Sequence, residues 1–272
     1  SETALALILA VGAGLMIRSF GALTSVDPGF EPEGLLTFQL FLPNSSYPDA
    51  ATQLGFQDRL IEQLLAQPGV TGVAAMSGLP PVRPLDANTT QFEGIVQTQD
   101  SPPQNVDLYQ TVTTEYLETM QIQILEGRSF TASDDAGAVL VALVNESLAK
   151  KFYPGESPIG RQIAPGSAGF SAPWLEVVGV VADVKQAGLD APAGTELYFH
   201  YPQAGALRGL PSTMNYVVST SGDPALLAQA ARRTVWGLDR ALPVANVQTM
   251  TDAVGSAMAW ARFLTSLLSV FA

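Results

Sequence analysis

Two apolar segments at the ends of the chain constrain its fold more than any other feature. Residues 3–17 (TALALILAVGAGLMI) contain no charged side chain, and Arg262 is followed by a second such segment, FLTSLLSVFA. Each is shorter than the roughly 20 apolar residues that a membrane-spanning helix needs. We interpret the two segments as parts of transmembrane helices, one within residues 1–23 and one within 251–272. The residues between them, 24–250, are then expected to form a domain whose two ends both sit at the membrane.

Each apolar segment taken alone allows another interpretation. A secretory signal peptide starts with basic residues and ends at small residues. This segment instead starts with Ser1-Glu2 and ends in Met16-Ile17-Arg18. The C-terminal segment fits an amphipathic helix that packs on the domain equally well. The presence of a matching segment at each end favours the transmembrane interpretation.

The composition excludes several classes of function. The 272 residues include 13 Lys and Arg against 25 Asp and Glu, which gives a formal net charge of −12. Such a surface repels a phosphate backbone, so no nucleic-acid partner is expected. No cysteine is present, which excludes disulfides and thiolate ligands. His200 is the single histidine, so a histidine-rich metal site is excluded and a Ser-His-Asp triad would have to use this residue.

Two strand–helix–strand units are predicted near the two ends of the domain. The first comprises a strand at 35–43, a helix that Asp49 caps and that ends before Pro68-Gly69, and a strand at 70–76. The second comprises a strand at 214–220, a helix that starts at Asp223 and Pro224, and a strand at 244–247. Although the units lie far apart in the sequence, their strands are expected to pair into one ferredoxin-like α+β layer.

The residues between these units, about 79–205, have a different character. They are rich in turns and short strands, which are expected at 90–95, 106–113, 139–144, 175–181 and 196–201. Asn145 is expected to cap a short helix that ends at Pro154-Gly155, with basic residues in its last turn as the helix dipole favours. This segment is therefore predicted to form a β-rich subdomain inserted between the two units.

Four segments resemble those of one protein family. They are GAGLMIRSFGALTSVDPGFEPEGLLTFQLFLP, EYLETMQIQILEGRSFTASDD, VALVNESLAKKFYPGESPIGRQI and WLEVVGVVADVKQAGL. Their order and spacing resemble FtsX-like ABC transporter permeases with a MacB-like periplasmic core domain. The first segment looks most like the second half of the duplicated orphan permeases of bacteria, which carry two such domains and no fused ATPase.

The resemblance implies an α+β fold with a porter-like, ferredoxin-type layer. Residues 24–78 and 206–250 would form this layer, and residues 79–205 would be the inserted β-rich subdomain. The end of a transmembrane helix in 1–23 and a helix in 251–272 that leads into a second transmembrane segment would flank them.

The resemblance also implies a function. In such transporters, cytoplasmic ATP hydrolysis is coupled by mechanotransmission through membrane helices to export or release of a substrate, which is unknown here. The expected partners are a separate cytoplasmic ATPase subunit, the remainder of the permease with a second similar domain, and membrane lipid at both ends. The expected location is the bacterial inner membrane, with this domain on the periplasmic side. Two alternative functions stay open, a ligand-sensing extracytoplasmic domain of a membrane receptor and a membrane-anchored hydrolase.

Several charged residues that follow strands are candidate sites. Asp183 and Lys185 follow the apolar strand WLEVVGVVA, where a turn with solvated charges is more common than a catalytic pair. Arg128 precedes Asp134 and Asp135, and we interpret it as an arginine held by those acids. A divalent cation at the two aspartates is the other interpretation, but the further spaced oxygen ligands of a calcium loop are missing.

The single histidine is also predicted to be structural. His200 lies between Phe199 and Tyr201, which is typical of a strand residue. No G-x-S-x-G elbow, H-E-x-x-H motif or P-loop is found in the sequence. We therefore predict no catalytic, cofactor-binding or metal-binding residue, no cofactor and no enzymatic activity.

Overall fold

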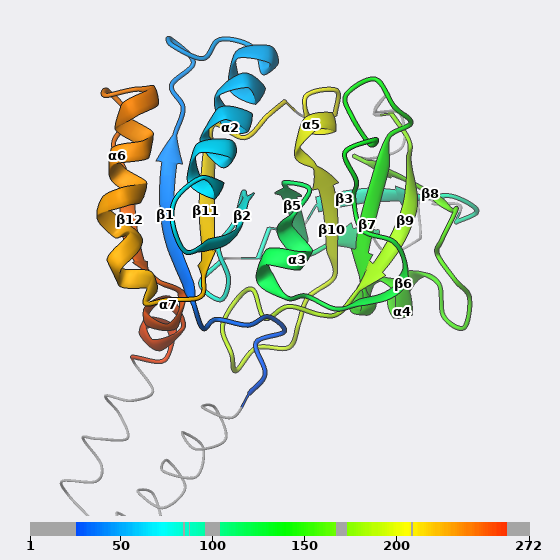
Figure 1. The fold of residues 1–272 in the computed structure, drawn as a ribbon. Helices are drawn as coiled ribbons and strands as arrows, with labels where there is room; N and C mark the ends of the chain where they lie inside the picture. Colours follow the sequence, from blue (N-terminus) through cyan, green and yellow to red (C-terminus); the bar gives the residue numbers. More distant parts are fainter. Residues whose placement is uncertain are drawn as a thin grey trace, which may run out of the picture.

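The strands that the structure describes form one twelve-stranded sheet (Figure 1). The computed structural model describes residues 26–83, 85–86, 88–95, 104–166, 173–207 and 209–259. The expected transmembrane segment in 1–23 and the last part of that in 251–272 lie outside these residues. None of the helices in the described ranges has the length and apolar character needed to cross a membrane.

Four strands from the two ends of the sequence lie side by side at one end of the sheet. They are β1 (Leu35–Phe41), β2 (Val70–Met76), β11 (Thr213–Thr220) and β12 (Ala245–Thr249). Their order is β12-β1-β11-β2, and every neighbouring pair is antiparallel. The predicted strands at 35–43, 70–76, 214–220 and 244–247 are thus confirmed, and so is their membership of one sheet.

Helices α2 (Ala50–Leu65) and α6 (Ala228–Leu238) cover one face of these four strands (Figure 1). Alternate β1 residues project toward this face, and Leu36, Phe38 and Leu40 are buried there in one cluster with residues of both helices. The ring of Phe38 stacks on that of Tyr216, with 5.0 Å between centroids. The alternation of apolar and polar residues in β1 therefore decides which face the helices cover.

The middle of the sequence supplies the remainder of the sheet and most of the short helices. The other strands are β3 (Asn88–Phe92), β4 (Asn105–Val106), β5 (Leu108–Val112), β6 (Ile124–Gly127), β7 (Val141–Asn145), β8 (Gln162–Pro165), β9 (Leu175–Val181) and β10 (Glu196–His200). The other helices are α3 (Tyr116–Met120), α4 (Glu146–Phe152), α5 (Tyr201–Ala204), the 3-10 helix η1 (Pro224–Leu227) and α7 (Met250–Ala257). A single residue pair, Met76 with Val112, joins β2 to β5 and so connects the two parts of the sheet.

The predicted helix starts are confirmed in atomic detail. The Asp49 side chain accepts a hydrogen bond from the backbone nitrogen of Thr52 at 2.8 Å. The Asn145 side chain accepts one from Leu148 at 3.0 Å, which places it at the N-cap of α4. Asp223 also caps, but it begins η1, and α6 follows only at Ala228.

Other predictions for the middle of the chain need correction. The expected strand at 106–113 is divided into β4 and β5 at Asp107, whose backbone and carboxylate both bond to Thr195 instead. The expected strand at 196–201 ends at His200, because Tyr201 begins α5. Helix α3 and strands β6 and β8 were not predicted.

The division into subdomains near residues 79 and 205 stays a prediction, because both parts share the sheet and a buried cluster that contains Leu35, Tyr116 and Met250.

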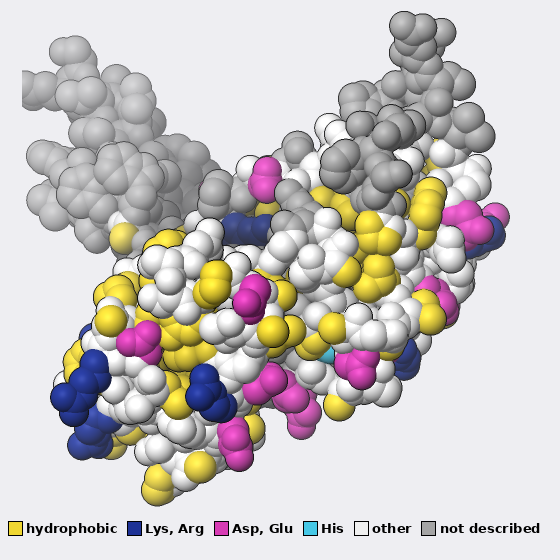
Figure 2. Space-filling view, turned by 90° about the horizontal axis from the view of Figure 1, so that it is seen from above, with side chains coloured by type: hydrophobic (Ala, Val, Ile, Leu, Met, Phe, Trp, Pro, Cys, Tyr) yellow, Lys and Arg dark blue, Asp and Glu magenta, His cyan; other side chains and the backbone are white. Residues whose placement is uncertain are grey.

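The surface has an uneven distribution of charge. Figure 2 shows the face of the molecule that is seen from above in the view of Figure 1. Acidic side chains gather near the middle of the lower edge of this face, whereas a group of Lys and Arg lies at its left end. The charges on this face are therefore unevenly distributed.

Replacing Asn145 by Ala is expected to destabilise the fold more than removal of an exposed cap. Asn145 is fully buried, and besides capping α4 it donates to Gly194 and accepts from the backbone nitrogen of Glu196. The variant loses a cap and leaves buried groups unpaired, so the free energy of unfolding should fall by about 3 kcal/mol. Asp49→Ala, which removes a fully exposed cap, should lower it less. Chemical denaturation measures both values. The exposed Asn44→Ala is the control, and an equal loss in the two cap variants would contradict the structure.

Candidate functional site

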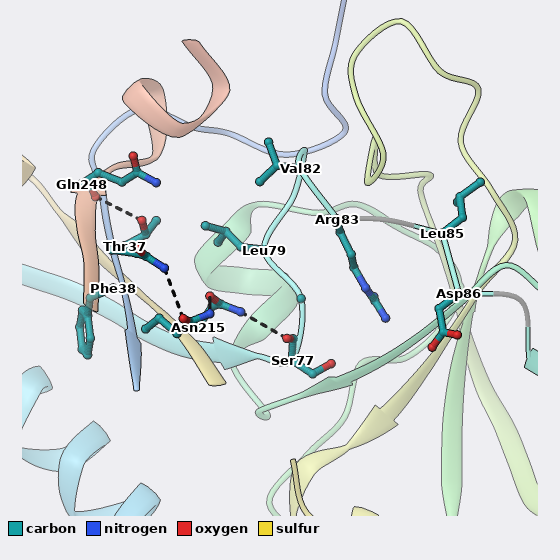
Figure 3. A pocket seen from close by; sticks show the side chains of 13 residues that line it. Thr37, Phe38, Ser77, Leu79, Val82, Arg83, Leu85, Asp86, Asn215 and Gln248 are labelled. Atoms are coloured by element: carbon teal, nitrogen blue, oxygen red, sulfur yellow. Dashed lines mark hydrogen bonds between the residues drawn. The ribbon is translucent and has the colours of Figure 1, made fainter. Parts of the chain in front are cut away.

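A cavity of about 630 Å³ lies on the face of the four strands that α2 and α6 leave uncovered (Figure 3). Thr37 and Gln39 alternate with the buried β1 residues and so project to this face. Asn215 from β11 and Gln248 from β12 line the same cavity. We call this cavity the amide groove, because side-chain amides form most of its floor.

The amides of the groove are joined to one another across four strands. Asn246 donates to Gln39 at 3.3 Å, and Gln39 donates to Asn215 at 3.1 Å. Asn215 in turn donates to the backbone oxygens of Met76 and Ser77 at 3.4 and 3.3 Å. A connected network of this kind fixes the orientation of each amide. The floor is therefore a rigid polar surface, and it contains neither an acid–base pair nor a nucleophile with an adjacent base.

Residues 77–83 and 85–86 form the opposite wall, and Arg83 anchors it (Figure 3). The Arg83 guanidinium donates to the Gln110 side chain at 2.9 Å and to the backbone oxygen of Tyr109. Gly78 makes room for this arrangement, since a Cβ atom there would lie 2.3 Å from the Arg83 side chain. On the rim, Val82 is 58% and Leu85 is 59% exposed.

Behind Arg83 lies a buried carboxyl group that sequence reasoning missed. Glu196 is fully buried in β10 and accepts hydrogen bonds from Gln186 at 3.0 and 3.1 Å and from the Tyr198 hydroxyl at 2.7 Å. An Arg83 nitrogen lies 3.7 Å from one of its oxygens. Burial raises the pKa of Glu196 to about 7, although the Arg83 charge and these hydrogen bonds lower it. The signal in the sequence was an acidic residue directly before the apolar residues Leu197–Phe199 of the predicted strand.

Arg128 is held as predicted, but by one acid and not by two. Its two terminal nitrogens donate to the Asp134 carboxylate at 2.7 and 2.8 Å. The hydrogen bond from Arg128 lowers the pKa of Asp134 to about 2, and two bonds from Thr131 act in the same direction. Asp135 instead accepts from the backbone of Gly137. Among the described residues, no group of three or more His, Asp and Glu could hold a metal ion.

Asp183 and Lys185 are half-buried and hydrogen-bonded, whereas the sequence suggested solvated charges. Asp183 accepts from the backbone and hydroxyl of Ser147 at 2.9 and 2.6 Å and from Asn145 at 2.7 Å. Lys185 donates to the backbone oxygen of Ala191 at 2.7 Å. These contacts tie the segment after β9 to the start of α4 and to its own loop, which is a structural use of both charges.

His200 is a strand residue, as predicted. One ring nitrogen lies 2.7 Å from the backbone oxygen of Asp134 and the other 3.0 Å from the Thr114 hydroxyl. The ring stacks on Phe130 at 4.7 Å, and burial lowers the pKa of His200. A neutral, packed imidazole with these partners stabilises the end of β10.

The pH dependence of stability tests the buried Glu196. Because its folded-state pKa lies above the usual value of 4.5, the stability it contributes is full below that pH and is lost as the pH rises through about 7. Relative to Glu196→Gln, the free energy of unfolding of the parent chain should fall by about 2–3 kcal/mol between pH 5 and pH 8. Urea unfolding at both pH values measures this. Glu118→Gln, an exposed site, is the control, and parallel profiles for parent and Glu196→Gln would refute the assignment.

Comparison with known proteins agrees with this picture. The family model described as MacB-like periplasmic core domain matches residues 3–234. The pyoverdine export ATP-binding/permease protein PvdT of Pseudomonas aeruginosa is 27% identical over 131 residues, which are 47% of this chain and 19% of that protein. The chain therefore spans about a fifth of the length of this curated relative.

Two solved structures resemble the fold. The periplasmic region of MacB from Actinobacillus actinomycetemcomitans gives a TM-score of 0.52 at 13% identity, and the match covers 85% of this chain and 95% of that one. The extracellular domain of the noncanonic ABC-type transporter YknZ from Gram-positive bacteria gives 0.49 at 17% identity, covering 78% and 100%. At this identity the MacB likeness concerns the fold alone. Together with the match over residues 3–234, it leads to one conclusion: the chain belongs to the family of MacB-like periplasmic core domains of ABC transporter permeases.

Proposed function

We propose that this domain couples ATP hydrolysis on a separate cytoplasmic subunit to the export or release of a substrate. The observation that carries the proposal is that the described chain enters and leaves on the same side of the molecule (Figure 1). There the Thr251 hydroxyl of α7 lies 3.4 Å from the backbone oxygen of Pro32. The apolar segments 3–17 and 263–272 lie beyond these two ends in the sequence, and in this proposal both enter one membrane.

In this proposal, residues 24–78 and 206–250 form the porter-like subdomain and residues 79–205 the insert. The order β12-β1-β11-β2, with α2 and α6 on one face, is that expected of a ferredoxin-like layer. The single pair Met76–Val112 between β2 and β5 supports a boundary there.

Helix α7 is the proposed route of coupling. Thr249 caps it by accepting from the backbone nitrogen of Asp252 at 3.1 Å. Its residues Met250 and Ala253 are buried in the cluster that contains Leu35 of β1. A displacement of the segment after α7 would therefore reach β12 and β1 through packed side chains rather than through a flexible linker.

The cellular setting follows from the same proposal. The domain would lie on the periplasmic side of the bacterial inner membrane, next to a second similar domain of the same permease. The PvdT relative is an export protein with an ATP-binding part, which supports a permease more than a receptor. The amide groove is the feature that supports a ligand-sensing role as the alternative function.

Cysteine cross-linking tests the arrangement of the two ends. This chain has no native cysteine, so engineered pairs near Arg18 and Arg262 meet no competing thiol within it. In the intact membrane protein, at least one pair should cross-link, because both segments are expected to run side by side. A pair at Asn44 and Arg262 is the control and should stay unlinked. Failure of every pair in the Arg18–Arg262 region would contradict the proposal that the two segments run side by side in the membrane.

Glycine insertion tests the coupling itself. Two glycines inserted after Arg262 should uncouple the domain from its ATPase, since a flexible joint dissipates a displacement. The readout is the ATPase activity and the export-linked phenotype of the assembled transporter. The same insertion after Ser221, in the turn that precedes η1, should leave both unchanged. Unchanged activity in the first variant would show that the helix does not transmit motion.

A further inference from the structure

A group of arginines lies at the α6 side of the molecule. Figure 1 has α6 at the left, and Figure 2, which keeps that side at the left, shows basic side chains there. Three of the 13 Lys and Arg of the sequence are Arg232, Arg233 and Arg240. Arg232 donates to the backbone oxygen of Val244 at 3.1 Å. Arg233 and Arg240 are exposed, and none of the ion pairs among the described residues includes either of them.

The acidic residue next to these arginines is engaged elsewhere. The Asp239 carboxylate accepts from the Tyr47 hydroxyl at 2.9 Å and from the backbone nitrogen of Ala241 at 2.8 Å. At physiological salt, charges are screened beyond about 8 Å, so acidic residues in distant parts of the chain do not cancel the two arginine charges. A local positive surface therefore remains on a chain whose net charge is −12.

A hollow of about 470 Å³ lies between the two arginines, and Trp236 and Gly237 line it with them. We call this surface the arginine–tryptophan hollow. Trp236 is 41% exposed, and its indole nitrogen donates to the backbone oxygen of Leu242 at 3.2 Å. Because that bond fixes the ring, a partner that packs on it would cost little side-chain entropy.

Gly237 keeps the hollow open. It lies in α6, where alanine is the better helix former, and its φ is not in the left-handed region. A Cβ atom there would meet no atom of the described chain within 4 Å. Within the described chain, neither packing nor backbone conformation requires a glycine at this position. Its effect is a bare stretch of helix surface between Arg233 and Arg240, with room for a side chain from outside.

The composition of the hollow is typical of a protein–protein contact. Trp and Arg are enriched among the residues that dominate the binding energy of such contacts. A guanidinium pairs with a carboxylate through two parallel hydrogen bonds, which makes acidic side chains its best partners. The described lining comes from a single helix and the residues after it. Such a surface does not enclose a small molecule on most sides, whereas a protein segment can extend from it along α6.

The position of the hollow disfavours an anionic lipid as its ligand. The indole of Trp236 bonds to Leu242, shortly before β12 begins, whereas α7 follows the other end of β12. The five residues of β12 span about 16 Å. A membrane that the chain enters after α7 would therefore lie farther from the hollow than electrostatic attraction reaches at physiological salt.

We propose that the arginine–tryptophan hollow docks an acidic segment of a partner protein, with carboxylates at Arg233 and Arg240 and an apolar side chain over Trp236 and Gly237. Helix α6 covers the face of the strands opposite to the amide groove, so the two surfaces are separate. The test of this docking needs neither an ATPase nor export, and its outcome is independent of the coupling function proposed above.

The probe is a fluorescein-labelled peptide in which glutamates flank one phenylalanine, and fluorescence anisotropy follows its binding to the full chain. It should bind about tenfold more tightly than the same peptide with glutamines in place of the glutamates. Arg233→Gln and Arg240→Gln should each weaken binding by about fivefold. Arg161→Gln removes the same charge at an exposed site between α4 and β8, and this control should bind as the parent does.

Gly237→Ala separates docking from a structural role. The added methyl group should raise the melting temperature by about 1–2 °C, because alanine favours a helix. The same methyl group fills the floor of the hollow and should weaken peptide binding by about fivefold. Gly55→Ala is the matched control, since Gly55 is an exposed residue of α2 where a Cβ atom also meets nothing within 4 Å. It should raise the melting temperature similarly and leave binding unchanged.

Other outcomes would overturn the proposal. Equal affinity for the glutamate and glutamine peptides would mean that the arginines do not select the ligand. Equal weakening in Arg233→Gln and Arg161→Gln would reduce the effect to overall charge. Unchanged binding in Gly237→Ala would show that the peptide does not enter the hollow. If phosphatidylglycerol vesicles bind through Arg233 and the peptide does not bind, the hollow belongs to a lipid surface instead.

Discussion

The pairing of β1 with β11 is the interaction on which the rest of the structure depends. Seven consecutive residue pairs join the two strands, and the Gln39–Asn215 contact within them spans 176 positions of sequence. This ladder brings the two strand–helix–strand units together, so that α2 and α6 can share one apolar cluster. On the other face, it aligns the amides of the groove. Without it, neither the covered nor the open face of this part of the sheet would exist.

A second constraint operates in the middle of the chain, where buried polar groups fix the loops. Asn145 contacts the backbone of Leu148, Gly194 and Glu196 as well as the Asp183 carboxylate. Each of these bonds satisfies a group that would otherwise be costly to bury. The charged residues that the sequence offers as catalytic candidates are thus used to hold strands, caps and turns.

Local chemistry predicted the elements well, and long-range contacts account for what it missed. Strands with clear alternation and helices with a capping Asp or Asn, such as those after Asp49 and Asn145, follow from neighbouring residues alone. Helix α3 is only five residues long, and the four residues of β6 are all exposed, with no alternation to detect. Burial raises the pKa of Glu196, and its partners Arg83 and Gln186 come from other parts of the sequence. Such contacts are set by the sheet and are not encoded in any short pattern.

The distance in sequence between β1 and β11 also has a consequence during synthesis. At roughly 5–20 residues per second, a ribosome needs on the order of 10–35 s to make the 176 residues that separate Gln39 from Asn215. Throughout that interval β1 has neither of its sheet neighbours, because β12 is made later still. The apolar residues Leu36, Phe38 and Leu40 are then exposed on a nascent chain, which makes this segment a natural client for chaperones before the domain closes.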